Sequence, residues 1–361
     1  MIAVYYVTKF RRAFILSVIL VSIIIVILTQ VSTESPRATV TSTDSKYIAL
    51  DKPNSQLARP EFVTSNQIIA KNLKFNVSGE DLLVFLHIQK TGGTTFEKHL
   101  VRDLNIEPAC LCSNSKRRCD CKRPGKGRTN SFPGSTWLVS RFSTGWICGL
   151  HPDWTQLQAC LAGLKKLFLV TWLRHPLYRT VSEFRHVHRG ATWRSARSYC
   201  KQYDTQLCYP ENENWLEVSL DEFLDCPSNM GINRQTRMLA DYSKIECMDL
   251  NDQSGGMDSK EMLDSAKQTL KRMAFFGLCE HQRASQFVFE RTLGLDFARA
   301  FSQSQDNKTV EYVRQLPERL KKKIMSRNRM DLKLYQYATE LFEERCRNFK
   351  DETLCKGIAS G

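Results

Sequence analysis

A run of nine residues, His87–Thr95, has the composition of a phosphate-binding loop and reads HIQKTGGTT. Its two adjacent glycines permit the unusual backbone angles that such a loop needs, and Lys90 would neutralise phosphate charge. Thr94 and Thr95 would add hydroxyl donors. The run is not a Walker A loop, because its lysine precedes the glycines. We therefore prefer a phosphate site to an ordinary strand-to-helix turn, and the missing Walker A loop argues against a kinase.

Arg174 and Ser182 form a second candidate phosphate site. Arg174 ends an apolar run, and Ser182 lies in the helical pattern that follows it. Arginine suits a phosphate because its planar guanidinium makes paired hydrogen bonds. Alone, the pair would be read as an ordinary surface ion pair. We nevertheless favour a phosphate site, because the pair follows a second apolar run just as His87–Thr95 follows the first.

Three histidines are candidates for a general base: His87, His151 and His186. Histidine suits the role because its unperturbed pKa is near 6.5. The residues alone do not choose among the three, and a lone histidine such as His151 is more often structural than catalytic. No H-E-x-x-H or other transition-metal pattern is present. We expect no bound metal.

These residues depend on elements that alternate along the chain. Three continuous apolar runs predict strands buried on both faces: Leu82–Ile88, Lys166–Arg174 and Ala274–Leu278. Helical patterns cover Phe96–Asp103, the residues after Pro176, Met262–Arg272, Gln282–Thr292 and Met330–Phe349. The alternation predicts an α/β fold with a central parallel sheet and helices on both faces. Ligands of such sheets bind at the carboxyl ends of the strands, which is where both candidate phosphate sites fall.

The charge of the chain indicates a polyanionic partner. With 52 Lys and Arg against 38 Asp and Glu, the formal net charge is 52 − 38 = +14. Two basic runs, Lys116–Arg128 and Lys165–Arg197, flank the candidate sites. Each alone could be a solvated loop. Together they predict a groove for a polyanion, with binding that weakens as salt rises.

The N-terminus predicts a membrane anchor. Ala13–Thr29 is an uncharged run of 17 residues, preceded by three basic residues. Such a helix spans roughly 25 Å, and the positive-inside rule places the chain after it in the lumen. A cleaved signal peptide is the alternative, but the run ends in a poor cleavage site. Residues 30–79, rich in Ser, Thr, Asn and Pro, would form a stem, and Asn76 and Asn307 begin glycosylation patterns.

The cysteines agree with a lumenal location. The chain has 13, and the first four, at 110, 112, 119 and 121, follow a C-x-C…C-x-C pattern. That spacing is unusual for zinc, and thiols oxidise in this compartment, so we favour disulfides. The connectivity stays open. The odd count leaves at least one cysteine free or paired with another chain, and Cys279 lies in an apolar stretch.

The run FLHIQKTGGTTF at residues 85–96 closely resembles the heparan sulfate 6-O-sulfotransferases. Further blocks resemble the same family in order: SRFSTGW at 140–146, CGLH at 148–151 with Asp153-Trp154, RHVHRGATW at 185–193, NRQTRMLAD at 233–241 and MAFFGL at 273–278. A sulfotransferase of another kind would share only the first loop and the Arg…Ser pair. The resemblance runs from about residue 81 to about residue 349.

The resemblance implies a P-loop-like sulfotransferase fold and a single-pass type II enzyme of the Golgi membrane. Such an enzyme transfers sulfuryl from 3′-phosphoadenylyl sulfate to the 6-hydroxyl of glucosamine in heparan sulfate. It implies that His151 is the base, that Lys90 also assists catalysis, and that Arg174 and Ser182 hold the donor's 3′-phosphate. The donor's 5′-phosphosulfate would lie on His87, Ile88, Gln89, Lys90, Thr91, Gly92, Gly93, Thr94 and Thr95. The glycan would lie on Arg117, Arg118, Arg141, Trp146, His186 and Trp193.

One departure from the family stands at the second site, where Arg174-His175-Pro176 replaces the frequent Arg-Asp-Pro, so an acidic neighbour is missing. We divide the chain into a cytosolic tail (1–12), an anchor (13–29), a lumenal stem (30–79), a catalytic domain (80–350) and a C-terminal tail (351–361).

Two alternatives stay open: another glycan O-sulfotransferase, acting at the 2-O position or on chondroitin, and a non-catalytic membrane-tethered heparin-binding protein. A nucleic acid is a further candidate polyanion, but the lumenal location favours a sulfated glycan.

Overall fold

The computed structural model describes residues 58–113, 118–125, 132–188, 216–226, 229–243, 257–302, 308–349, 352–356 and 358. All of them belong to one compact unit, Lys52–Gly361. The predicted anchor at 13–29 and most of the predicted stem lie outside the described residues. Among the helices that are described, none is long and apolar enough to cross a membrane.

Four parallel strands form the central sheet, in the order β4 (Leu138–Val139), β1 (Leu82–Leu86), β5 (Leu167–Leu173) and β6 (Phe275–Leu278). Every residue of these strands is buried, because helices cover both faces. The longest pairing runs from Leu82 opposite Leu167 to Leu86 opposite Thr171, so β1 and β5 end side by side. The three predicted strands are confirmed, and the two-residue β4 is an addition.

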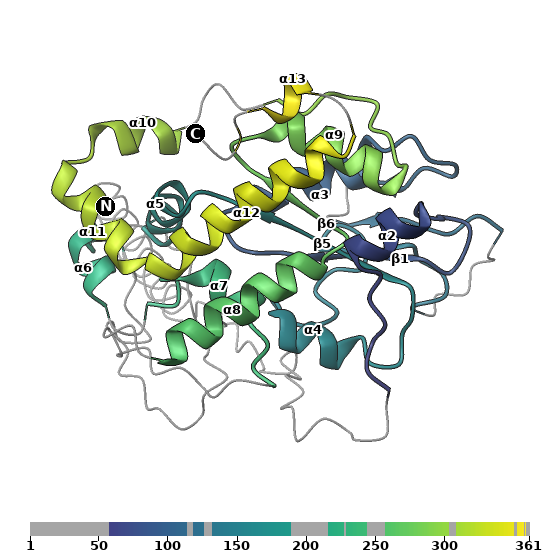
Figure 1. Ribbon diagram of the computed structural model, residues 1–361, viewed down its shortest axis with the longest axis horizontal. Coiled ribbons are helices and arrows are strands. Elements are labelled where there is room, and N and C mark those ends of the chain that lie inside the picture. Colours follow the sequence, from purple (N-terminus) through teal and green to yellow (C-terminus); the bar gives the residue numbers. More distant parts are fainter. Residues whose placement is uncertain are drawn as a thin grey trace, which may run out of the picture. The chain divides into compact units, whose positions relative to one another are not determined.

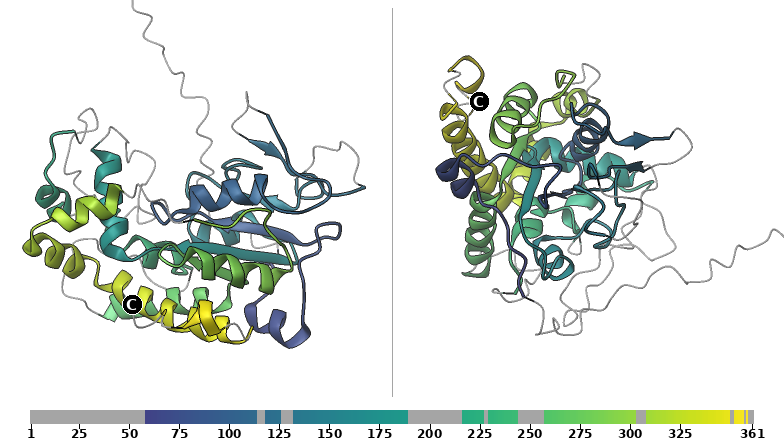
Figure 2. Two further views of the ribbon diagram at one scale, coloured as in Figure 1. Left: turned by 90° about the horizontal axis from the view of Figure 1, so that it is seen from above. Right: turned by 90° about the vertical axis from the view of Figure 1, so that its right-hand side faces the viewer.

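The helices lie in two layers, one on each face of the sheet (Figure 1). One layer holds α3 (Gly93–Arg102) and α9 (Gln282–Leu293), whose Phe96 and Phe289 rings are 5.5 Å apart. The other layer holds α4 (Trp154–Cys160) and α8 (Met257–Arg272). α12 (Arg329–Arg347) packs against α8, α9 and β6. Seen from above, α3 and α9 cross the near side of the strands (Figure 2).

The remaining elements sit beyond these layers. They are α2 (Ser65–Lys71), α5 (Pro176–Val187), α6 (Leu220–Asp225), α7 (Arg234–Leu239), α10 (Lys308–Gln315), α11 (Glu318–Arg327), α13 (Glu352–Cys355), and a hairpin of β2 (Leu111–Cys112) with β3 (Cys119–Asp120). α5, α6, α10 and α11 enclose a second, smaller apolar cluster. The predicted helices are confirmed, with ends that differ by a few residues.

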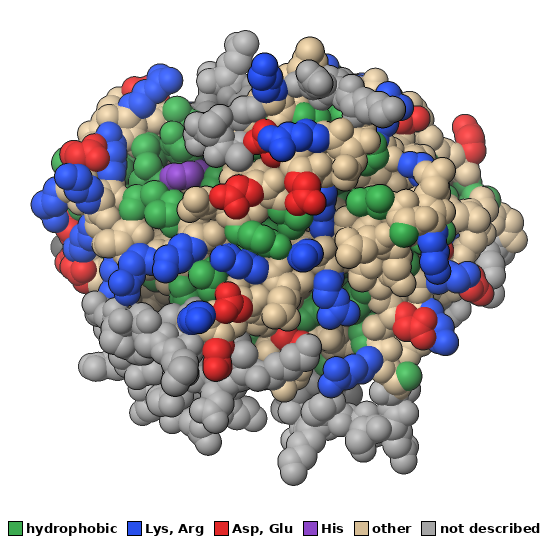
Figure 3. Space-filling view, viewed as in Figure 1, with side chains coloured by type: hydrophobic (Ala, Val, Ile, Leu, Met, Phe, Trp, Pro, Cys, Tyr) green, Lys and Arg blue, Asp and Glu red, His purple; other side chains and the backbone are tan. Residues whose placement is uncertain are grey.

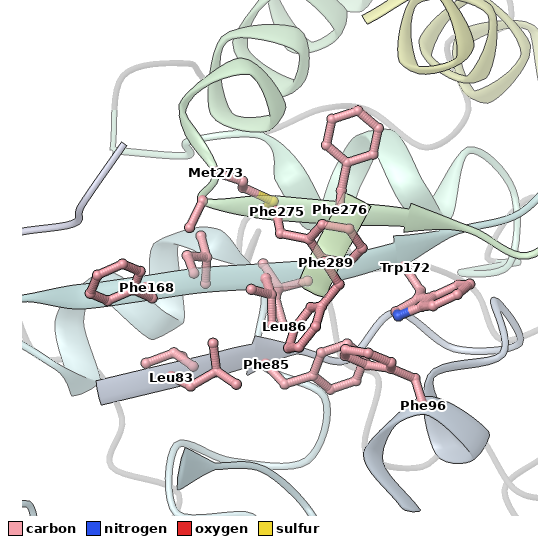
Figure 4. Close-up of a cluster of buried hydrophobic side chains, with 14 of the residues drawn as sticks. Leu83, Phe85, Leu86, Phe96, Phe168, Trp172, Met273, Phe275, Phe276 and Phe289 are labelled. Atoms are coloured by element: carbon pink, nitrogen blue, oxygen red, sulfur yellow. The ribbon is translucent and has the colours of Figure 1, made fainter. Parts of the chain in front are cut away.

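The main apolar core joins the sheet to both helical layers (Figure 4). Aromatic side chains dominate it on the α3 side, where the Phe96 ring lies 5.2 Å from Trp172. The same ring also contacts Phe297 and Phe301. Aromatic pairs of this kind add to the stability that area burial gives. This packing fixes α3 against β1 and β5, and so fixes the loop between β1 and α3.

The compact unit begins before residue 80, at which the catalytic domain was predicted to start. Thr64 caps α2 by accepting a hydrogen bond from the backbone N–H of Gln67. Ile68 and Phe75 are buried in the main core. The backbone N–H of Val63 also donates to the carbonyl of Leu167 on β5. Residues 58–79 are therefore part of the folded domain.

The face that carries α8 and α12 has mixed charge. A row of Lys and Arg side chains crosses its middle, with acidic side chains on both sides of the row (Figure 3). The acidic side chains offset part of the positive charge of this row. The surplus of 14 positive charges is therefore not gathered into one uninterrupted basic surface on this face.

Candidate active site

The phosphate loop, which we define as His87–Thr95, joins β1 to α3. Lys90 has φ +67° and Gly92, the N-cap of α3, has φ +95°, so the chain turns sharply into the helix. Gly92 provides no side-chain cap. The first N–H groups of an α-helix lack intrahelical partners, and here they face the end of the sheet with the positive end of the helix dipole. The predicted strand–loop–helix cradle is confirmed in its backbone.

The two glycines leave no room for larger residues. A Cβ at Gly93 would lie 2.9 Å from Cζ of Phe85, and a Cβ at Gly92 would lie 3.2 Å from Sγ of Cys279. The loop is thus closed from behind by β1 and by the residue that follows β6. An anion at the helix N-terminus can approach the backbone of this loop without meeting a side chain from either glycine.

Arg174 reaches the phosphate loop from the end of β5. Its Nη1 donates to the carbonyl of Lys90 at 3.3 Å, and the side chain is mostly buried. Gln235 of α7 holds the backbone of Arg174 at both polar groups, each at 2.9 Å. Asp331 of α12 accepts in turn from the backbone N–H groups of Gln235 and Thr236. The two predicted phosphate sites therefore meet, and the 233–241 block fixes one of them.

An acidic neighbour of Arg174 is present, although it does not come from position 175. Glu280, after β6, places Oε1 3.1 Å from the backbone nitrogen of His175 and 3.9 Å from Nε of Arg174. Tyr335 donates to its Oε2 at 2.7 Å. Burial raises the pKa of Glu280. The prediction that Arg174 lacks an acidic neighbour is therefore wrong, because Glu280, which follows β6, lies beside it.

His151 lies beside the phosphate loop. Its Nδ1 is 3.2 Å from the carbonyl oxygen of His87, which can only accept, so Nδ1 carries the proton and Nε2 can accept another. Its φ of +53° is in the left-handed region, a conformation that non-glycine residues adopt rarely and often at functional sites. The Trp146 ring packs 4.6 Å from the His151 ring. His151 therefore combines a fixed tautomer with a place at this loop.

The electrostatic surroundings keep the His151 imidazole neutral. Burial lowers its pKa to about 3, with His87, Arg234 and Arg141 acting in the same direction. The value near 6.5 that suits an exposed histidine does not apply here. A neutral imidazole can accept a proton over the whole range around neutral pH.

The 140–151 loop, the irregular segment between β4 and α4, carries Arg141, Trp146 and His151. The Arg141 guanidinium lies 5.6 Å from the centre of the Trp146 ring. A disulfide joins Cys148 to Cys160 of α4. On the other side, Arg118 donates to the carbonyl of Thr144 at 3.3 Å. Three of the predicted glycan-binding residues, 118, 141 and 146, thus share one surface around His151.

Two further predicted site residues lie on α5, the helix that follows Arg174. Ser182 is partly exposed on the second turn of α5, and His186 is exposed on the same helix. His186 follows Pro176 by about 15 Å of helix, so it is a poor candidate for the base. Asn76 is exposed, as a glycosylation site requires. Arg117, Trp193 and Asn307 lie outside the described residues.

The first four cysteines form disulfides, as expected. The pairs are Cys110–Cys121 and Cys112–Cys119, which staple the β2–β3 hairpin. Cys346 pairs with Cys355. Cys279 is a free cysteine, and burial raises its pKa to about 12, so its thiol stays protonated.

A buried charge cluster behind the phosphate loop was not predicted. Arg234 of α7 donates to Oε1 of Gln89 at 2.9 Å and lies 3.4 Å from Glu183 of α5. Arg179 also contacts Glu183 and lies 3.7 Å from Asp331. Burial raises the pKa of Glu183, but Arg234 and Arg179 outweigh it and hold that pKa below its usual value. The NRQTRMLAD block signalled Arg234 only as part of a resemblance, without a role, and it contains neither Arg179 nor Glu183.

Within the described residues, no group of three His, Cys, Asp or Glu side chains could hold a metal ion.

The loop between β1 and α3, Arg174 after the neighbouring strand and a neutral histidine lie together at one end of the parallel sheet. The sulfotransferase family model matches residues 73–338, so the class is sulfotransferase.

Three relatives narrow the class. Heparan-sulfate 6-O-sulfotransferase 2 of Gallus gallus is 42% identical over 303 residues, covering 79% of this chain and 73% of the relative. Heparan-sulfate 6-O-sulfotransferase 3-B of Danio rerio is 39% identical, covering 84% and 74%. Heparan-sulfate 6-O-sulfotransferase 1 of Homo sapiens is 42% identical, covering 77% and 69%. The chain belongs to the heparan-sulfate 6-O-sulfotransferase family of enzymes.

Proposed function

We propose that this chain transfers sulfuryl from 3′-phosphoadenylyl sulfate to the 6-hydroxyl of glucosamine in heparan sulfate, with His151 as the general base. The observation that carries the proposal is the meeting of His151 with the phosphate loop: its Nδ1–H is bonded to the carbonyl of His87, and its Nε2 is left as the accepting nitrogen. The names of the relatives support the glycan and the position.

The residues fit the donor. The cradle of Gly92 and Gly93 would hold the 5′-phosphosulfate against the N-terminus of α3, and Arg174 with Ser182 would hold the 3′-phosphate. When bound, the donor supplies an activated sulfuryl group whose bond to the phosphate oxygen breaks as the acceptor oxygen bonds to sulfur. Lys90 stabilises the negative charge that builds on the leaving oxygen.

The chain's own part in the reaction is proton removal and positioning. Nε2 of His151 takes the proton of the acceptor hydroxyl, while the His87 carbonyl keeps the ring oriented. Because Lys90, Arg174 and the helix N-terminus supply positive charge at the leaving group, we expect transfer to proceed with chelator present.

The acceptor would lie on the 140–151 loop. Arg118 and Arg141 would bind its sulfate and carboxylate groups, and Trp146 would pack against a sugar ring. By resemblance, Arg117, His186 and Trp193 would extend this surface. Such an aromatic platform is needed because contacts to charged groups alone would not fix the orientation of a pyranose ring.

We place the enzyme in the Golgi membrane as a single-pass type II protein, anchored by residues 13–29. Disulfides at 110–121, 112–119, 148–160 and 346–355, all within the described residues, support an oxidising compartment. The exposed Asn76 supports glycosylation there.

The test is direct. The full chain, purified in detergent, is incubated with labelled donor, desulfated heparan sulfate and chelator, and the polymer is digested to disaccharides. Label on the glucosamine 6-position is the expected result. Label at another position would reassign the acceptor, and donor binding without transfer would favour the tethered heparin-binding protein.

A further inference from the structure

Glu97 is a buried carboxylate between the phosphate loop and the 140–151 loop. It lies on the second turn of α3 and is 0% exposed. We propose that Glu97 is a positioning residue for sulfuryl transfer, which holds His87 and, through His87, the base His151. The inference rests on the proposed function, because it assigns a role within the same site.

The two oxygens of Glu97 bind the two loops. Oε2 accepts from Nδ1–H of His87 at 2.7 Å, and Oε1 accepts from the backbone N–H of Arg141 at 2.8 Å. The neighbouring buried positions of α3 are apolar, namely Gly93, Phe96, Leu100 and Val101. Burying a carboxylate among them is unfavourable unless its hydrogen bonds compensate. Glu97 thus makes two hydrogen bonds that an apolar residue at this position could not make.

The carboxylate also fixes the proton of His87. An ionised carboxylate only accepts, so Nδ1 of His87 carries a hydrogen, and Nε2 is the other ring nitrogen. That Nε2 lies 3.5 Å from the point where a Cβ on Gly93 would stand, at the N-terminus of α3. The Glu97 bond therefore turns Nε2 of the His87 ring toward the N-terminus of α3.

His151 depends on His87 through two contacts. The carbonyl of His87 accepts from Nδ1–H of His151, and the two rings lie 5.0 Å apart. The Trp146 ring packs against both, 5.7 Å from His87 and 4.6 Å from His151. A displaced His87 ring would therefore act on His151 through the ring packing, and a displaced His87 backbone would act through the carbonyl bond. A misplacement of about 1 Å can lower a rate by about 100-fold.

Glu97→Gln separates this role from simple stabilisation. Glutamine has the same shape and keeps an oxygen for the Arg141 N–H. Its amide nitrogen must donate to Nδ1 of His87, which moves the imidazole proton to Nε2. We expect kcat to fall about 10- to 100-fold, with a donor-product Kd within about threefold of wild type.

Glu290→Gln is the matched control. Glu290 of α9 also accepts from one backbone N–H, that of Phe297, and one side-chain N–H, that of Gln286. It contacts neither loop of the site in these bonds. We expect it to change thermal stability about as much as Glu97→Gln and to leave kcat within twofold of wild type.

The spectroscopic test is the tautomer of His87. In the full chain, ring-nitrogen NMR shifts should report Nδ1–H in wild type and Nε2–H in Glu97→Gln, with the His87 signals identified by their loss in His87→Gln. A kcat of Glu97→Gln equal to that of Glu290→Gln, or an unchanged tautomer, would overturn the inference while wild-type transfer to the 6-position still supports the proposed function. A wild-type chain without any transfer would overturn both.

Discussion

The two halves of the site are built differently. The proposed donor half consists of the phosphate loop and Arg174, which directly follow two neighbouring parallel strands. The acceptor half is the 140–151 loop, an irregular segment held by Cys148–Cys160, the Arg118 contact and the Glu97 bond. The proposed anion site is built by local backbone geometry, whereas the proposed base is placed by contacts between distant residues. Changes to one half should therefore leave the ligand of the other half largely unaffected.

The largest expected effect is on the base. We expect His151→Ala to lower kcat by about 10²- to 10⁴-fold, because a general base contributes about that much. Donor-product binding, measured by calorimetry, should stay close to wild type. His99→Ala is the control, since the ring of His99 on α3 is likewise held through Nδ1, by the carboxylate of Asp103, and stacks on Phe301. Full turnover in His151→Ala would remove His151 as the base.

A change to the donor half should weaken donor binding, which the change to the base leaves intact. Gly92→Ala places a methyl 3.2 Å from Cys279 Sγ at a φ of +95°, so the loop must move. We expect donor-product Kd to rise at least about tenfold, since the helix N-terminus loses its approach to the anion. Gly125→Ala is matched for backbone strain, at φ +68°, but its Cβ meets nothing within 4 Å.

Both glycine variants should lose about 1–2 kcal/mol of stability, because an L-residue is strained in the left-handed region. Only Gly92→Ala should lose donor binding. Equal donor binding in the two variants would mean that the phosphate loop is not the donor site.

The acceptor half should respond to the loss of its disulfide. We expect the double change Cys148→Ser and Cys160→Ser to raise KM for heparan sulfate severalfold, because the 140–151 loop is released at one end. Donor-product binding should not change. The control is Cys346→Ser with Cys355→Ser, which opens a bridge of similar separation, 9 against 12 residues, at the C-terminal helices.

Both pairs should lower stability by up to about 3 kcal/mol, as bridges of this length do. A KM change in the control pair as large as in the first would show that general loosening, rather than the loop, is responsible.

The contrast also explains what the sequence could predict. β1, β5 and β6 were found because strands buried on both faces read as continuous apolar runs. The phosphate loop could be predicted because the residues that form it are consecutive in the sequence. The pairing of Cys148 with Cys160 was not found, because spacing does not determine connectivity.

Glu97 and Asp331 were missed for a related reason. Both are charged residues at buried helix positions, and their partners lie on other elements. A carboxylate within an apolar face, at 97 beside 96, 100 and 101, was the available signal. It marks a residue that must find a partner, but it does not say which one.

The smallest expected effect is on the pH profile, and it also tests the placement of His151. Only the neutral imidazole can accept the proton, so kcat/KM falls as pH drops through the pKa of His151. Because burial lowers that pKa to about 3, kcat/KM should stay nearly flat from pH of about 7.5 down to about 5.5. A histidine with the ordinary pKa would lose about tenfold over the same range.

Arg141→Ala sharpens the same test. The Arg141 charge lowers the pKa of His151, so its removal should raise that pKa and move the acid limb to higher pH. Arg299→Ala, which removes an exposed arginine bound to Asp103, should leave the normalised profile unchanged. Absolute rates will fall in Arg141→Ala if Arg141 binds the glycan, which is why the shapes of the normalised profiles are compared. A wild-type acid limb centred near 6.5 would show that the imidazole is solvated, and the acceptor half would then be held more loosely than its contacts indicate.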